Sequence, residues 1–373
     1  MINEKIEQAV GILKEKNIDM WMTFVRESST MPDPAVEVIV GTSCTWQTAY
    51  IITATGETIA IAGSLDVANL KSKRNYKEII GYVQSVKEPL LEVLNRINPE
   101  TIAINYSTNT VIADGLTHGM WLQLMSYLEG TPFKDRIISA EQIISALRGR
   151  KSPTELKLMK AAIKETLKIF EMVTRFIEQG KTELDIANYI LKEAKKLGVE
   201  PAWDQEYCPS VFTGPESAGA HTGPTKRKIE GRHILNIDFG IKWKGYSSDL
   251  QRTWYIRKKG ETKIPHEVLK GFNTIVESIQ LAAKALKPGV QGCEMDDIAR
   301  NHITSKGYAE YPHALGHQIG RVAHDGGGLL CPRWERYGTL PYEKVEAGQV
   351  YTLEPRLTVE GYGVATVEEM VIV

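Results

Sequence analysis

Residues 234–255 read ILNIDFGIKWKGYSSDLQRTWY, and this stretch decides the fold of the C-terminal part of the chain. Two runs rich in apolar and β-branched residues flank a short polar segment, which is the pattern of a β-hairpin. If Trp243 and Lys244 form a two-residue turn, Asp238 and Asp249 face each other across the ladder with Cβ atoms roughly 5 Å apart. Two unshielded carboxylates that close repel each other. The hairpin therefore predicts a bound cation.

A second hairpin with the same property is predicted over residues 351–371, which read YTLEPRLTVEGYGVATVEEMV. If the chain folds back around Gly361, Glu354 and Glu368 face each other across the ladder. In the same register Arg356 faces Thr366. One facing carboxylate pair is compatible with chance, but two such pairs in one domain indicate a metal site.

A histidine-rich segment lies between the two hairpins. Residues 312–328 read PHALGHQIGRVAHDGGG and contain His313, His317 and His324, three of the eight histidines of the chain. Four carboxylates and one imidazole are ligands that suit Mn²⁺, Co²⁺, Fe²⁺ or Zn²⁺. The four negative charges are neutralised by two divalent cations and not by one. Two cations roughly 3.5–4 Å apart can activate a shared water and polarise a substrate carbonyl. The pattern predicts a two-metal hydrolase.

The chain is expected to form two domains, residues 1–148 and 153–373. The first alternates helical patterns (2–16 and 88–96) with strand patterns (18–25, 36–40, 45–54, 58–62 and 101–105), which indicates a small α/β domain. At the boundary Ser152 is a good N-cap, with Pro153 at the first helical position and Glu155 in the first turn, so a long helix is expected from Pro153 to about residue 178.

The second domain contains a faint internal repeat. Residues 180–187 resemble residues 292–299, with one residue inserted in the second copy. Each copy follows a long helical pattern, opens another helix that ends at Gly198 or Gly307, and leads into strands. Two halves, each a helix pair plus a sheet, give an α+β architecture with a functional site between them.

Composition narrows the range of functions. The 373 residues contain 45 Lys and Arg against 46 Asp and Glu, so no basic excess points to nucleic acid or to an anionic membrane surface. No signal peptide and no membrane-spanning stretch are recognised. The four cysteines are scattered without metal-binding spacing, which favours reduced, structural thiols. A cytoplasmic enzyme is expected.

These motifs together resemble the prolidase and aminopeptidase P family of pita-bread-fold metallopeptidases. The resemblance rests on the D-x10-D hairpin, the H-x3-H-x2-G-x3-H-D run, the Glu-Pro strand and the final glutamate, and it covers the whole chain. It implies an α+β chain in which a duplicated pita-bread domain follows a small N-terminal domain of the creatinase and prolidase type. It further implies a homodimer that hydrolyses an Xaa-Pro bond of a small peptide, as a dipeptidase or an aminopeptidase, with a hydroxide bridging two metals.

The resemblance also assigns roles to residues. It implies metal ligands at five positions, with Asp249 and Glu368 bridging both ions: Asp238, Asp249, His317, Glu354 and Glu368. Glu354 would also transfer the proton from water to the leaving amine. His324 would stabilise the oxyanion. His221 and His313 match histidines of the substrate pocket, and His221 is also a candidate catalytic residue.

Two positions depart from the family pattern. Arg356 follows the Glu-Pro pair where a glycine is usual, and Thr366 precedes the last ligand where an arginine is usual. Our hypothesis is that Arg356 supplies the guanidinium that Thr366 lacks and contacts the substrate. Because this change lies near the leaving group, a non-peptide amide or a lyase substrate at the same metal site stays open as an alternative. A catalytically inactive binding protein is a third alternative, which the presence of all five ligand residues disfavours.

Overall fold

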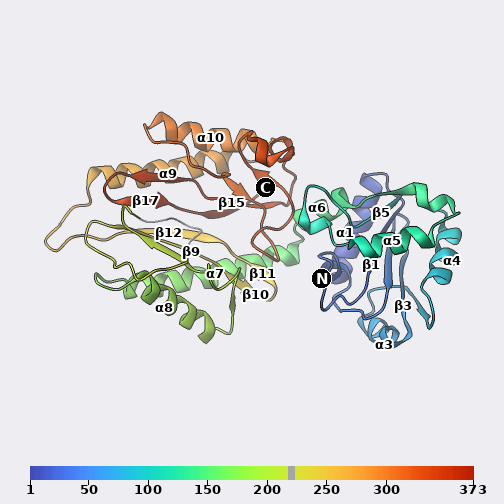
Figure 1. Ribbon diagram of the computed structural model, residues 1–373. Coiled ribbons are helices and arrows are strands. Elements are labelled where there is room, and N and C mark those ends of the chain that lie inside the picture. Colours follow the sequence, from blue (N-terminus) through green and yellow to red (C-terminus); the bar gives the residue numbers. More distant parts are fainter. Residues whose placement is uncertain (217–222) are drawn as a thin grey trace. The chain divides into compact units, whose positions relative to one another are not determined.

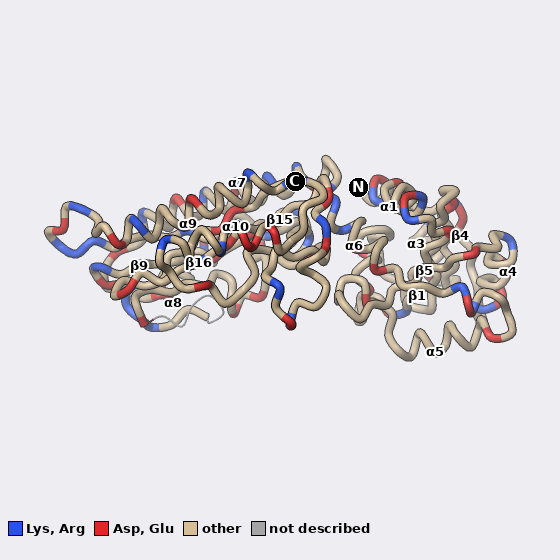
Figure 2. Tube along the Cα trace, turned by 90° about the horizontal axis from the view of Figure 1, so that it is seen from above, with Lys and Arg blue, Asp and Glu red and all other residues tan. Residues whose placement is uncertain are grey.

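The computed structural model describes residues 1–216 and 223–373, and the chain divides into two compact units, Met1–Arg148 and Gly149–Val373 (Figure 1). Basic and acidic residues are interspersed along both units, without a long run of one sign (Figure 2). None of the described helices is both long enough and apolar enough to cross a bilayer.

The N-terminal unit is built on a six-stranded sheet in the order β4-β3-β2-β1-β5-β6. Neighbours β1–β2 and β2–β3 are antiparallel, whereas β3–β4, β1–β5 and β5–β6 are parallel. The strands are β1 Met20–Val25, β2 Thr48–Thr53, β3 Thr58–Gly63, β4 Glu78–Tyr82, β5 Ile102–Ile104 and β6 Ile137–Ser139. Parallel neighbours require crossover connections, and helices supply most of them.

Apolar side chains cover both faces of this sheet. Trp21 belongs to the core on the side of α1 and α6, while Met20 and Met22 belong to the core on the side of α4 and α5, as the alternation of a strand requires. The helices are α1 Ile2–Glu15, α2 Val36–Ile39, α3 Ser64–Lys73, α4 Lys87–Ile97, α5 His118–Tyr127 and α6 Glu141–Gly149, with short 3-10 turns η1 Val111–Ala113 and η2 Pro132–Arg136.

One predicted strand of this unit is wrong. A β-strand was expected over residues 36–40, but Val36–Ile39 form the short helix α2. The Asp33 carboxylate accepts a hydrogen bond from the Ala35 N–H (2.8 Å), and the Asp33 carbonyl accepts one from Val36 (3.0 Å). These local bonds begin a helical turn, and they outweigh the β-propensity of the valines.

In the C-terminal unit the strands lie between two helix pairs (Figure 1). Helices α7 and α8 contact β10 and β8, and α9 contacts β16 and β17. The helices are α7 Pro153–Phe176, α8 Glu183–Lys196, α9 His266–Ala285 and α10 Gly292–Ser305, with 3-10 turns η3 Glu335–Tyr337 and η4 Leu340–Tyr342. The strands are β7 Glu200–Pro201, β8 Ser210–Thr213, β9 Ile234–Phe239, β10 Ile241–Trp243, β11 Tyr246–Ser247, β12 Leu250–Tyr255, β13 Gly316–His317, β14 Leu329–Leu330, β15 Val350–Leu353, β16 Arg356–Val359, β17 Gly363–Thr366 and β18 Glu369–Ile372. The predicted α+β class is confirmed.

The helix caps show how the two halves correspond. Ser152 caps α7 through a capping box with Glu155, as predicted. The second helix of each half also begins at a capping box, at Thr182 for α8 and at Gln291 for α10. If the two N-caps, Thr182 and Gln291, are aligned with each other, residue 180 aligns with residue 289. The alignment proposed from sequence letters, 180 with 292, is therefore off by three residues, because the caps and not the letters mark where each helix begins.

The register of the first hairpin differs from the prediction by one residue in the turn. Asp238 pairs with Gln251 and not with Asp249. The two-residue turn is Lys244-Gly245, since Trp243 pairs with Tyr246, and both turn residues have positive φ, 49° and 84°. This geometry matches the twist of the strands and favours glycine at the second position. Moving the turn by one residue moves each partner by two, so Asp238 and Asp249 stay on the same face as diagonal neighbours.

The register of the second hairpin is as predicted. Arg356 pairs with Thr366 in the β16–β17 ladder, and Leu353 pairs with Glu369 in the β15–β18 ladder. Between these two ladders the same register leaves Glu354 opposite Glu368. The hairpins of the two halves meet where the Glu368 N–H donates to the Gln251 carbonyl (3.3 Å).

A buried ion pair on α10 holds the segment that leads into β13. The Asp296 carboxylate accepts two hydrogen bonds from Arg300 (2.6 and 2.9 Å) and one from the Leu315 N–H (3.1 Å). Arg300 also donates to the carbonyls of Tyr311 (2.7 Å) and His313 (2.9 Å). The side chains of Asp296 and Arg300 are 0% and 8% exposed. Two of these hydrogen bonds lie within the helix, and the other three tie it to the irregular segment.

We expect Arg300→Met to lower the free energy of unfolding by about 3–5 kcal/mol, because a buried carboxylate is left without its partner. The matched control is Arg333→Met, which removes the exposed ion pair of Arg333 with Asp297. This control should change the free energy of unfolding by less than about 1 kcal/mol. Denaturant unfolding of both variants measures the difference. Equal losses would show that the buried pair does not hold this segment.

Candidate metal centre

The five predicted ligands line one cavity of about 420 Å³ in the C-terminal unit. Two come from the β9–β12 hairpin, two from the C-terminal hairpin and one from β13: Asp238, Asp249, Glu354, Glu368 and His317. Residues separated by more than a hundred positions in the sequence therefore converge on one site.

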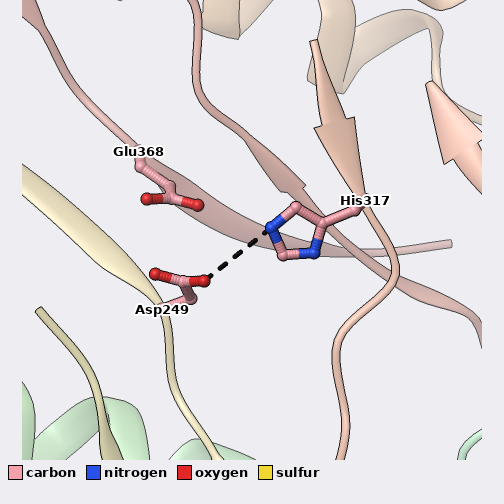
Figure 3. A group of neighbouring side chains, drawn as sticks. All are labelled: Asp249, His317 and Glu368. Carbon is pink, nitrogen blue, oxygen red and sulfur yellow. Dashed lines mark ion pairs between the residues drawn. The ribbon is translucent and has the colours of Figure 1, made fainter. Parts of the chain in front are cut away.

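Three of these side chains point toward one another (Figure 3). Asp249, His317 and Glu368 each offer a ligand atom within 4.8 Å of the others. His317 Nε2 lies 3.8 Å from Asp249 Oδ2 and 3.5 Å from Glu354 Oε1. These separations leave room for an ion between ligand atoms, since a divalent cation binds nitrogen and oxygen at roughly 2.0–2.2 Å.

Backbone contacts between β13 and β15 place His317 beside Glu354. A Cβ on Gly316 would lie 1.8 Å from the Thr352 carbonyl oxygen, so only glycine allows this approach. The Thr352 hydroxyl accepts from the His317 N–H (3.1 Å) and donates to Glu354 Oε1 (3.3 Å). The Glu354 N–H donates to the Leu315 carbonyl (2.8 Å). One threonine thus orients both candidate ligands.

Burial makes the charged forms of the carboxyl groups unfavourable when no cation is present. It raises the pKa of Asp238 to about 7 and that of Glu354 to about 8. Burial, followed by the charges of neighbouring carboxylates, also raises the pKa of Asp249 and of Glu368 well above the ordinary range. The protein by itself supplies little to neutralise these groups.

The histidine of the cluster is held in its neutral form. Burial, followed by the neighbouring His324, lowers the pKa of His317 to about 3. Its Nδ1 lies 3.2 Å from the Gln318 carbonyl, so we assign the proton to Nδ1, where it is donated to that oxygen. The Nε2 lone pair then faces Asp249 and Glu354. A lone pair directed at carboxylates is the arrangement that a cation stabilises.

The donor set fits a divalent cation. Asp238 Oδ1 is buried and has no hydrogen-bond partner among the described residues. A buried carboxylate oxygen without a partner is costly, and a bound ion removes that cost. Four carboxylates and one neutral imidazole are also ligands that metals such as Mn²⁺ or Zn²⁺ accept.

The structure places three more of the predicted site residues around the same cavity. His313, His324 and Arg356 all line it. The His324 ring lies edge-on to the His317 ring with centroids 4.2 Å apart. His313 Nδ1 lies 2.8 Å from the Ala314 carbonyl oxygen. His221, the remaining candidate, lies outside the described residues.

Sequence reasoning missed several residues of the cavity. The aromatic wall of the cavity consists of Trp203 and three side chains that no motif singled out: Tyr207, Phe212 and Tyr337. Gln251 and Thr366 also line the cavity beside the carboxylates. The register of β12 would have identified Gln251 as the partner of Asp238, but that register depends on the turn geometry.

We expect the metal-free protein to lose stability as the pH rises from about 4 to about 8. The folded-state pKa values of Asp238 and Glu354 are raised above their ordinary values, so the fold prefers the neutral acids. The stability that they contribute is complete below the unfolded-state pKa and is lost as the pH rises through the folded-state pKa. Thermal melting of chelator-treated protein between pH 4.5 and 8.5 measures this loss.

Mn²⁺ at pH 8, at about a thousand times its Kd, should raise Tm by roughly 8–16 °C. Mg²⁺ at the same ionic strength serves as the control for charge screening. A metal-free protein whose Tm is independent of pH and of Mn²⁺ would rule out a cation site at these carboxylates.

Comparisons with known proteins agree with this geometry. The family model of Metallopeptidase family M24 matches residues 157–373, more than half of the chain. An uncharacterized peptidase of Staphylococcus aureus strain USA300 is 27% identical over 326 residues, which cover 87% of this chain and 84% of that protein.

Solved structures match the whole fold. An Xaa-Pro dipeptidase from Bacillus anthracis superposes with a TM-score of 0.74 at 24% identity, covering 100% of this chain and 95% of that one. An X-Pro aminopeptidase from Thermotoga maritima gives a TM-score of 0.72 at 23% identity, covering 96% and 93%. The resemblance inferred from the motifs is confirmed, and the chain belongs to metallopeptidase family M24.

Proposed function

We propose that this protein hydrolyses the Xaa-Pro bond of short peptides with two divalent cations. The observation that carries the proposal is the convergence of four carboxylates and a neutral imidazole on one cavity, where one buried carboxylate oxygen has no hydrogen-bond partner in the described part of the chain. The names of two structurally similar proteins, an Xaa-Pro dipeptidase and an X-Pro aminopeptidase, support the choice of substrate.

Two cations would be held by five side chains: Asp238, Asp249, His317, Glu354 and Glu368. When bound, they would supply a water of lowered pKa and would polarise the scissile carbonyl. Because the four carboxylates carry four negative charges, two divalent ions leave the site neutral. A neutral site offsets the cost of burying these charges, and it removes the repulsion that adds to burial in raising the pKa of Asp249, Glu354 and Glu368.

Glu354 is the ligand best suited to move a proton. Its side chain is 21% exposed, whereas that of Asp249 is 8% exposed, so Glu354 is the more accessible of the two to a water molecule. Its Oε1 accepts from the Thr352 hydroxyl, which leaves Oε2 for the reacting water. We assign Glu354 to accept the proton of that water and to deliver it to the amine of the leaving proline.

His324 is placed to stabilise the charge that develops on the carbonyl oxygen. It lines the cavity beside His317, and its ring is held edge-on to the His317 ring. A donor fixed before the reaction stabilises an oxyanion without reorganisation. His313, on the segment held by Arg300, lies on the same cavity and is assigned to the substrate pocket.

The cavity also has a surface for a proline ring. Trp203, Tyr207, Phe212 and Tyr337 supply aromatic surface to a cavity whose lining is otherwise mostly polar. Apolar surface binds an apolar ring, and polar groups in the same cavity fix its orientation. This aromatic surface supports a substrate whose residue at the cleaved bond is a proline.

Arg356 is assigned to bind the carboxylate of the substrate. It is partly buried, burial lowers its pKa, and it has no acidic partner among the described residues. It lines the metal cavity directly across the ladder from Thr366. A desolvated guanidinium is stabilised by a carboxylate ligand. In a dipeptide the free carboxylate lies one residue from the cleaved bond, so Arg356 favours dipeptides.

We expect the purified protein to bind two Mn²⁺ or Co²⁺ ions per chain and to hydrolyse an X-Pro dipeptide faster than a longer X-Pro peptide. Metal analysis gives the stoichiometry, and release of proline gives the rate. Protein without bound metal would support an inactive binding protein. Two bound ions without cleavage of either peptide would point to a non-peptide amide or a lyase substrate.

We expect Arg356→Met to raise KM for an X-Pro dipeptide by about 10- to 150-fold, which corresponds to the loss of one charged hydrogen-bonding contact. kcat should change little, since Arg356 does not contact the reacting bond. The C-terminal amide of the same dipeptide should show no such increase.

Lys270→Met, which removes a cation from the neighbouring cavity that Arg356 also lines, is the matched control. An equal rise in KM for the acid and for the amide would contradict carboxylate recognition by Arg356.

A further inference from the structure

Gln251 joins the two hairpins of the candidate metal centre. On β12 it is the cross-strand partner of Asp238, and its carbonyl accepts the Glu368 N–H (3.3 Å). The residue is only 4% exposed. Gln251 is therefore largely shielded from solvent and stands next to one candidate ligand from each half of the unit.

The side-chain amide of Gln251 has a partner at each end. The Thr366 hydroxyl, which also lies 3.1 Å from the Pro355 carbonyl, is 2.8 Å from Gln251 Oε1 and donates to it. Burial raises the pKa of the carboxyl groups of Asp238 and Glu368, and the nearby Gln251 side chain partly offsets this rise at both, as a donor beside a carboxylate does. An amide oxygen accepts and an amide NH₂ donates. With the oxygen bonded to Thr366, the NH₂ is the end left to donate, and the carboxyl groups of Asp238 and Glu368 share the cavity with it.

We propose that Gln251 and Thr366 form a positioning pair for the metal centre. Gln251 holds Asp238 and Glu368 in the geometry that binds cations, and Thr366 acts through Gln251 by holding the amide in this orientation. The inference rests on the proposed metal centre and adds two residues to it that are not ligands.

The physical reason is that an amide has two equivalent-looking orientations. If the Gln251 amide rotates by half a turn, its oxygen faces two carboxylates and the repulsion disorders both. The Thr366 hydroxyl is the donor that favours one orientation. Groups that orient metal ligands typically change metal affinity by about 10–100-fold when they are removed.

Variants at Thr366 test the inference with little change in shape. Thr366→Val replaces the hydroxyl by a methyl group, and Thr366→Ser keeps the hydroxyl. Gln251→Met keeps the length of the side chain and removes its polar atoms. Thr274→Val is the control, because Thr274 is another buried threonine and its hydroxyl donates to the Lys270 carbonyl within α9.

The measurement is the Kd for Mn²⁺ in metal-stripped full-length protein, by titration calorimetry or by the spectrum of free Mn²⁺. We expect Thr366→Val to weaken binding about 10-fold and Gln251→Met about 10- to 100-fold. Thr366→Ser and Thr274→Val should bind within about 2-fold of the wild type. The double variant of Gln251→Met with Thr366→Val should bind no more weakly than Gln251→Met alone, since Thr366 acts only through Gln251.

Wild-type affinity in Thr366→Val, or losses that multiply in the double variant, would overturn the pairing. If Gln251→Met does not fold, the contrast of Thr366→Val with Thr366→Ser decides alone. The wild-type titration separates this inference from the proposed function. If the wild type binds no Mn²⁺, both the proposed function and the positioning pair are rejected. If it binds Mn²⁺ but cleaves no peptide, only the peptidase activity is rejected, and the variants still test the positioning pair.

Discussion

Four carboxyl groups share one poorly solvated cavity, and much of the C-terminal unit is organised around this constraint. Burial and mutual repulsion disfavour the charged forms of Asp249 and Glu368, and nearby hydrogen-bond donors offset only part of that cost. The groups are held together because each pair stands on a hairpin whose ladder hydrogen bonds fix its position. A cation turns the same arrangement from a source of repulsion into a set of ligands.

Rigidity around the site comes from polar contacts that are themselves buried. The ion pair of Asp296 and Arg300 holds the segment that bears His313, and Thr352 connects the His317 backbone to Glu354. Gln251 connects the two hairpins. Each of these groups makes hydrogen bonds inside the protein. The duplicated helix pairs cover the outer faces of the strands, so the site is supported from both halves.

Most elements and one of the two hairpin registers could be predicted from the sequence. The predicted register of the second hairpin was correct because it is compatible with a turn around Gly361. The ladders on both sides of Glu354 have this register. The first was shifted because the choice of turn residues depends on positive φ at Lys244 and Gly245, which residue letters alone do not specify. The error did not separate the aspartates, since a change of two positions keeps a side chain on its face.

The sequence by itself determined which groups are available for metal binding and their order along the chain, because carboxylate and imidazole chemistry follows from residue type. It also determined the family, through the spacing of those residues. Tertiary structure alone decided the partners of Gln251, the aromatic wall and the environment of Arg356. The physical reason is distance along the chain: the Thr366 hydroxyl meets an amide 115 positions away, and no local pattern encodes that contact.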